Sequence, residues 1–271
     1  MRALLSTGFA LVLVLGACTA NPGRVLESAE SDQPPRVLAA RADSLFAVEP
    51  RTPSRAREAF QALREAAQAS DPEHPDRYRY LVDAAQYAVW AANHTDDGDV
   101  QSDLAEQAIT LSNTAIQADS NRVEGYFYRA VATGLFIQEN KLKGRSGMSE
   151  IRADAQRAID LDPTFSHGGP YRVLGTLYLR APGPPTGIGS VRRALRYLTQ
   201  AYEVAPKHPA NLLRLAEAHL ETGTPTKAAD LLDQFDEALA AYDGADLAEE
   251  DWRTDAADLR RRLNDSSSSG S

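Results

Sequence analysis

The segment YRVLGTLY, residues 171–178, decides the fold of this 271-residue chain. Tyr171, Leu174, Gly175 and Tyr178 follow one another at intervals of three, one and three residues, which places them on one face of an α-helix. The small residue lets a second helix pack closely, and the larger residues fill the space beside it. The same pattern recurs in two further segments, YRAVATGL at 128–135 and LLRLAEAH at 212–219.

Alanine-rich segments alternate with this pattern. Three of them share the spacing of their alanines: AITLSNTAIQADS at 108–120, AQRAIDLDP at 155–163 and ALRYLTQAYEVAP at 194–206. Paired helices with these spacings are typical of the tetratricopeptide repeat (TPR). The alternating Val, Ile and Thr runs that would mark strands are missing from the sequence. We therefore predict an all-α fold, a TPR-like helical repeat array (α-solenoid) of about eleven helices.

The helical domain is expected to cover residues 36–263, followed by a Ser-rich, disordered tail at 264–271. Breaks between helices are expected at Asp-Pro, Gly and Asn clusters. The helices are predicted at residues 36–48, 54–69, 77–93, 102–118, 122–139, 148–161, 168–181, 190–204, 208–222, 225–241 and 249–263.

The repeat period is longer than that of a plain TPR. Asp119, Asp162 and Ala205 occupy equivalent positions and are 43 residues apart each time, whereas the usual period is about 34 residues. The excess is expected in two connectors, ENKLKGRSGMSE at 139–150 and RAPGPPTGIGS at 180–190. Because insertions in a solenoid map to one edge, often a binding edge, we expect both connectors to line a groove or pore.

The N-terminus predicts export. Residues 1–17 hold one Arg, an apolar run and the small residues Gly16 and Ala17 before Cys18, the single cysteine. The run is too short to span a bilayer and fits a signal peptide. Leu-Gly-Ala-Cys resembles the lipobox of bacterial lipoproteins, which implies lipidation at Cys18; the alternative is an ordinary signal with a chance cysteine. Residues 18–35 are expected to form a flexible tether. Thr19 favours the outer membrane, periplasmic face, by the same resemblance.

Composition and motifs argue against several functional classes. Acidic residues outnumber basic ones, 38 to 29, which disfavours nucleic-acid binding. The five histidines are scattered without metal-ligand spacing, and GPPTGIGS lacks the ending of a phosphate-binding loop. We therefore predict no catalytic residue, no metal and no cofactor, although an enzyme with an unrecognised site stays an open alternative.

The inner face of the array is the candidate ligand site. On a TPR helix, the residues one after and two before the first large residue point toward the groove, and others follow one turn later. Two repeats then present an Arg, a Thr and an apolar residue at equivalent places, which suits an amphipathic anion. The competing interpretation is that Arg129 and Arg172 pair with acids such as Glu124 or Asp162, and that Tyr171 packs in the core. The candidate ligand-binding residues are Tyr126, Arg129, Thr133, Phe136, Gly169, Tyr171, Arg172 and Thr176.

Residues 110–240 resemble the T-component lipoproteins associated with TRAP transporters (TatT-like). The resemblance rests on GGPYRVLGTLY at 168–178, the Gly-rich turn that follows, and Ala194-Leu195. It continues through Ala201 to Pro206 and into the next helix. One departure is Ser190, where the family often has an acidic residue.

The resemblance implies a periplasm-facing lipoprotein that forms a homotrimer. Each protomer would enclose a ligand-sized pore, dock a periplasmic solute-binding protein and handle a small organic acid without chemical change. Two functions therefore stay open. One is an accessory protein of a TRAP-type system that binds or passes a small organic-acid or hydrophobic ligand. The other is a TPR scaffold lipoprotein for protein–protein interactions in envelope assembly.

Overall fold

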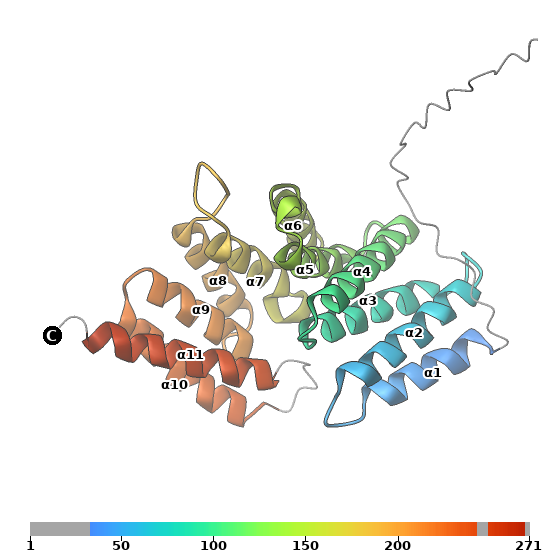
Figure 1. Ribbon diagram of the computed structural model, residues 1–271, viewed down its shortest axis with the longest axis horizontal. Helices are drawn as coiled ribbons and strands as arrows, with labels where there is room; N and C mark the ends of the chain where they lie inside the picture. Colours follow the sequence, from blue (N-terminus) through green and yellow to red (C-terminus); the bar gives the residue numbers. More distant parts are fainter. Residues whose placement is uncertain (1–32, 243–248, 269–271) are drawn as a thin grey trace, which may run out of the picture.

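The computed structural model describes residues 33–242 and 249–268, and over these ranges the chain forms eleven α-helices and one 3-10 helix, η1. The predicted all-α repeat array is confirmed (Figure 1). The elements are α1 (Pro35–Phe46), α2 (Pro53–Ala69), α3 (Arg77–Asn93), α4 (Gly98–Ala118), α5 (Val123–Glu139), η1 (Lys141–Lys143), α6 (Gly144–Leu161), α7 (Phe165–Arg180), α8 (Val191–Val204), α9 (Pro209–Glu221), α10 (Pro225–Ala240) and α11 (Glu249–Ser268).

The helices form two layers. From α1 to α11, each helix contacts the next one in the chain, and short connectors make such neighbours antiparallel. The odd-numbered helices also contact one another in the order α3, α5, α7, α9 and α11. These helices form an inner layer, and α4, α6, α8 and α10 are packed between them on the other side. No helix among the described residues is long and apolar enough to cross a bilayer.

In the core, small residues of one helix pack against large side chains of the next helix, as the sequence predicts. Gly175 of α7 lies against Leu198 of α8, where an added Cβ would overlap the leucine side chain. Tyr178 is buried and its ring is stacked on Tyr197, with centroids 5.7 Å apart. One buried cluster joins α7 to α11 with parts of α5 and α6, and α1 to α5 share a second one. Helix packing thus follows the spacing found in residues 171–178.

The two long connectors differ in structure. In the first, α6 begins at Gly144, four residues earlier than predicted, so most of the inserted sequence is helical. In the second, residues 181–190 stay non-helical and end at Ser190, whose Oγ accepts a hydrogen bond from the Arg193 N–H over 3.4 Å. Ser190 is therefore a helix N-cap, which is a role that a serine performs as well as an acidic residue.

Helix α7 begins with an unusual turn. Ser166, His167 and Gly168 all have positive φ, at 48°, 56° and 79°, and regular helix follows with Pro170 in its first turn, where proline is tolerated. A Cβ on Gly168 would lie 3.1 Å from the Ala201 Cα. Both its φ and this close approach therefore require glycine.

Several predictions concern the ends of the chain. Helix α11 continues to Ser268, so the first five residues of the segment expected as a disordered tail, 264–268, are helical. The signal peptide, Cys18 and the tether up to residue 32 lie outside the described residues, as do residues 269–271.

Helix α4 begins at Gly98 rather than at residue 102, because the Asp97 side chain caps it.

Candidate functional site

A groove of about 1170 Å³ runs along the inner layer. Its walls come from α3, α5, α7, α9 and α11, completed by η1, the first half of α6 and the segment after α7. Trp90 of α3 borders it on one side and Trp252 of α11 on the other. The groove is therefore made by consecutive repeats and not by any single helix pair.

The lining combines apolar walls with positive charge. The apolar residues include Val89, Trp90, Phe127, Val131, Leu135, Ile137, Met148, Ile151, Val173, Leu177 and Trp252. The charged residues that line the groove are Lys141, Arg145, Arg172, Arg180 and Arg214. No Asp or Glu of the described chain is among the lining residues, although acids outnumber bases in the whole sequence. The groove therefore favours anions over cations.

Three of the eight predicted residues line the groove: Gly169, Arg172 and Thr176, all from α7. Arg180 lies on the same face, one turn further along. The remaining five, Tyr126, Arg129, Thr133, Phe136 and Tyr171, are not lining residues. The structure therefore assembles the α7 part of the predicted site and separates the α5 part from it.

Arg129 points into the interface between helices. Its Nε and Nη2 donate to the two carboxylate oxygens of Asp154 on α6, over 2.8 and 2.5 Å, and Nη1 donates to Asn113 on α4 over 2.6 Å. Asp154 is buried. The hydrogen bonds to Asp154 raise the pKa of Arg129 above its ordinary value. Arg129 thus pairs with an acid, as the competing interpretation held, but the acid is neither Glu124 nor Asp162.

The other four residues also pack away from the groove. Thr133 is buried, with its methyl group near Gly147 of α6. Phe136 packs against the cluster of α1 to α5, and Tyr126 against the small cluster of Val123, Phe127 and Ala158. Tyr171 is half-buried outside the groove.

Arg172 lies at the groove wall and is held by neighbouring groups. Its Nη1 donates to the Asn211 Oδ1 over 2.7 Å, and its guanidinium also reaches the backbone oxygens of Ser166 and His167. Asn211, which is fully buried, donates to the oxygens of His167, Ala201 and Ala205 over 2.9 to 3.1 Å. The two side chains fix the left-handed turn at the start of α7.

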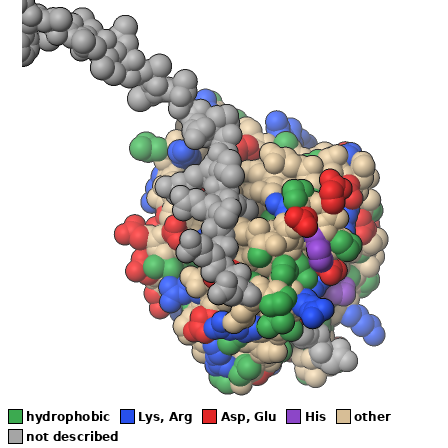
Figure 2. Space-filling view, turned by 90° about the vertical axis from the view of Figure 1, so that its right-hand side faces the viewer, with side chains coloured by type: hydrophobic (Ala, Val, Ile, Leu, Met, Phe, Trp, Pro, Cys, Tyr) green, Lys and Arg blue, Asp and Glu red, His purple; other side chains and the backbone are tan. Residues whose placement is uncertain are grey.

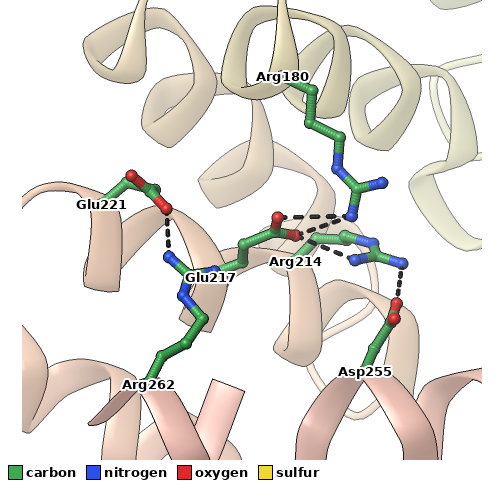
Figure 3. Close-up of polar contacts among 6 residues, drawn as sticks. All are labelled: Arg180, Arg214, Glu217, Glu221, Asp255 and Arg262. Atoms are coloured by element: carbon green, nitrogen blue, oxygen red, sulfur yellow. Dashed lines mark hydrogen bonds and ion pairs between the residues drawn. The ribbon is translucent and has the colours of Figure 1, made fainter. Parts of the chain in front are cut away.

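A charge network joins α7, α9 and α11 at the other side of the groove (Figure 3). Arg214 of α9 donates to Glu217 over 3.0 Å and to Asp255 of α11 over 2.5 Å, while Arg180 of α7 approaches Glu217 at 3.4 Å. Burial would raise the pKa of Glu217, but attraction by Arg214 and Arg180 outweighs it, so the pKa lies below its ordinary value. A second ion pair, between Arg262 of α11 and Glu221 of α9, joins two of these helices again.

Sequence reasoning missed most of the cations of the groove, Lys141, Arg145, Arg180 and Arg214. One signal could have found Arg180, because Arg172, Thr176 and Arg180 follow each other at intervals of four on a single helix. In the described part of the chain, no group of three or more His, Cys, Asp or Glu could hold a metal ion.

Comparison with known proteins supports the fold. A tetratricopeptide repeat family model matches residues 189–234, from just before α8 into α10. No curated protein has a matching sequence. A thermophilic TPR protein of Thermus thermophilus has a similar structure, with a TM-score of 0.58 and 18% identity over 83% of this chain and 98% of that one. The PilF protein of Pseudomonas aeruginosa gives 0.51 and 16%, over 84% and 90%.

MamA of Desulfovibrio magneticus RS-1 is similar at a TM-score of 0.50 and 12% identity, over 80% of this chain and all of the other. These identities are low, so they define the fold alone. The chain is a TPR-like helical array.

Proposed function

We propose that the groove binds an elongated, mainly apolar organic anion without changing it chemically. The observation that carries this proposal is the lining itself, which has five cationic residues, no carboxylate and apolar walls. Its volume of about 1170 Å³ is slightly above the usual range of small-molecule sites, about 300–1000 Å³, which suits a long ligand. Apolar burial would provide affinity, and the cations would select the sign of the charge.

The setting of this function follows from the N-terminal sequence and the family resemblance. We propose a lipoprotein that is acylated at Cys18 and faces the periplasm, anchored to the outer membrane. In this setting it serves as an accessory protein of a TRAP-type transport system, docks the periplasmic solute-binding protein and assembles as a homotrimer. The lipobox and the motif at residues 168–178 support this part of the proposal.

Calorimetric titration with three ligands that share one alkyl chain tests the groove. Decanoate, decanol and decyltrimethylammonium differ in the charge of the head group. The groove should bind decanoate most tightly and the cation least, because every charged residue of its lining in the described chain is a cation, although Arg180 and Arg214 are paired with the acids Glu217 and Asp255. Equal affinities for the three ligands would contradict anion selection.

Thr176→Glu and Thr176→Gln form a matched pair of variants for the same titration, because Thr176 lines the groove between Arg172 and Arg180. The two substitutions have nearly the same volume and differ in one negative charge. Thr176→Glu should weaken decanoate binding about tenfold relative to Thr176→Gln, with decanol affected equally by both. An equal effect of both substitutions on decanoate would place the anion elsewhere.

A second candidate function is binding of an apolar, acidic peptide segment of another envelope protein. The TPR-like array and the open groove between Trp90 and Trp252 favour it. A photo-crosslinking residue at Leu177, which lines the groove, would distinguish the two functions in cells. The scaffold function predicts a discrete protein adduct from Leu177 and none from the exposed Arg57 of α2; adducts from both positions, or from neither, would contradict it.

A further inference from the structure

Two connectors project from one edge of the array. Helices α5 and α7 are both in the inner layer and run in the same direction, so the segments that follow them leave the array on the same side. Figure 1 shows α6 and the loop after α7 as separate projections, both at the top of the view. Residues from both also line the groove. We call residues 140–149 and 179–198 together the cationic edge.

The cationic edge concentrates positive charge in an acidic chain. It holds seven basic residues, and the exposed acids Glu139 and Glu150 flank its first segment. The basic residues are Lys141, Lys143, Arg145, Arg180, Arg192, Arg193 and Arg196. Arg180 pairs with Glu217. The other six side chains form no ion pair with any residue of 33–242 or 249–268.

The face at the right of Figure 1, formed by α1 to α4, differs. Acidic and basic side chains are interspersed on it (Figure 2). A mixed surface of this kind has no preference for one sign of charge. The cationic edge is therefore a local property and does not reflect the chain as a whole.

The cationic edge also contains a fully exposed apolar side chain. Leu142, in η1, is completely exposed between Lys141 and Lys143. A leucine placed between lysines is a poor surface for water and a good one for the boundary between lipid head groups and acyl chains, because lysines extend their charges back to the head groups. The loop after α7 also exposes three prolines, Pro182, Pro184 and Pro185.

We propose that the cationic edge contacts the surface of an anionic phospholipid bilayer, with Leu142 inserted among the head groups. Basic residues next to an anionic membrane each contribute to binding, and they act without a fixed geometry. The described edge has that character, because its cations are spread over a projection. An acidic protein partner would instead call for a shaped surface of paired contacts. The contact does not rest on the ligand proposed for the groove. It would place the mouth of the groove next to the bilayer.

The test is flotation of the chain without its signal peptide, residues 18–271, with vesicles. This chain carries Cys18→Ser, because an acyl group on Cys18 or the apolar run of residues 1–17 would itself bind both kinds of vesicle. Vesicles of phosphatidylcholine alone are compared with vesicles of equal parts phosphatidylcholine and phosphatidylglycerol. We expect binding to the anionic vesicles only, and loss of that binding at high salt.

Two triple variants localise the contact. Lys141→Gln, Lys143→Gln and Arg145→Gln together should weaken binding to the anionic vesicles by about 100-fold. The matched control is Arg36→Gln, Arg41→Gln and Arg57→Gln, which removes three exposed charges from α1 and α2 and should leave binding unchanged. Leu142→Ser should weaken it by about tenfold.

Three outcomes would overturn the proposal. One is equal binding to both kinds of vesicle. Another is an equal loss in both triple variants, which would trace binding to net charge. The third is absence of vesicle binding together with retention on immobilised polyglutamate that depends on Lys141, Lys143 and Arg145, which would make the edge a surface for acidic proteins.

Discussion

Arg172 donates a hydrogen bond to the side-chain oxygen of Asn211 over 2.7 Å, and the two residues together hold three successive left-handed residues, 166–168, in place. Asn211 lies on α9 and bonds to the end of α8 as well as to His167. The turn, α8 and α9 are thus fixed by two side chains. The same contacts hold Arg172 in the wall of the groove. The position of this lining residue therefore depends on Asn211, which does not line the groove.

Asn211→Ala should destabilise the protein by about 3 kcal/mol, because three backbone oxygens, one of them buried, and Arg172 each lose a partner. Urea unfolding followed by circular dichroism measures this change. Asn121→Ala is the control, since Asn121 is exposed, and it should change the unfolding free energy by less than about 0.5 kcal/mol. Equal effects of the two substitutions would mean that the hydrogen bonds of Asn211 do not stabilise the turn.

Arg129→Met should cost about 3–5 kcal/mol, because it leaves the buried carboxylate of Asp154 without its cation. The double variant Arg129→Met/Asp154→Leu should recover to within about 1 kcal/mol of the parent, since no buried charge remains. Urea unfolding of the parent and the single and double variants gives the coupling between the two residues. Decanoate affinity should not change in the double variant, because Arg129 does not line the groove; a loss of affinity there would return Arg129 to the ligand site.

The repeat spacing predicts the fold well, and it also explains why the α5 part of the site is misplaced. Arg129 and Arg172 are 43 residues apart, which is one repeat period, so they occupy the same position in successive repeats. The acid that binds Arg129 is Asp154, but the residue 43 positions after it is Tyr197, which stacks on Tyr178. Arg172 therefore has no acid at the equivalent position of α8. A comparison of both helices of each pair would have separated the two arginines.

Other features of the groove could not be predicted from local sequence. Ser166 and His167 have no strong preference for positive φ, so nothing in their sequence predicts the left-handed turn. The turn exists because Asn211 bonds to it from 44 residues away along the chain. Arg145 lines the groove because the first connector folds as helix α6 from Gly144 onward. The two glycines of this connector, Gly144 and Gly147, instead predict a loop, since glycine is a poor helix former.

Gly175→Ala and Gly134→Ala should have opposite effects. A Cβ on Gly175 would overlap Leu198, which forces α7 and α8 apart and costs about 1–3 kcal/mol. A Cβ on Gly134 would lie 4.0 Å from Ile151, in ordinary contact, and alanine should stabilise α5 by about 0.5–1 kcal/mol. Thermal unfolding of both variants tests this pair. A gain in stability for Gly175→Ala would show that the two helices do not need a glycine between them.

Ionisation of Asp83 should lower the free energy of unfolding as the pH rises from about 4 to about 6. Burial raises the pKa of Asp83 to about 6, and the nearby acids Asp43 and Glu124 add to this, while Arg79 at 3.1 Å opposes it. In the unfolded chain an aspartate titrates near pH 3.9. Between these two values the folded state holds a proton that the unfolded state has released, so the free energy of unfolding falls as the pH rises. Above about pH 6 the loss is complete.

Asp83→Asn removes this titration. The variant should match the parent near pH 4 and be more stable by about 1–2 kcal/mol at pH 8, with the magnitude reduced because the side chain is partly exposed. Urea unfolding of both chains across this pH range measures the difference, and Asp233→Asn, an exposed position of α10, serves as the control with no change expected. If Asp83→Asn were instead less stable at pH 8, the ion pair with Arg79 would outweigh the cost of burying the carboxylate, and the pH dependence would have the opposite sign.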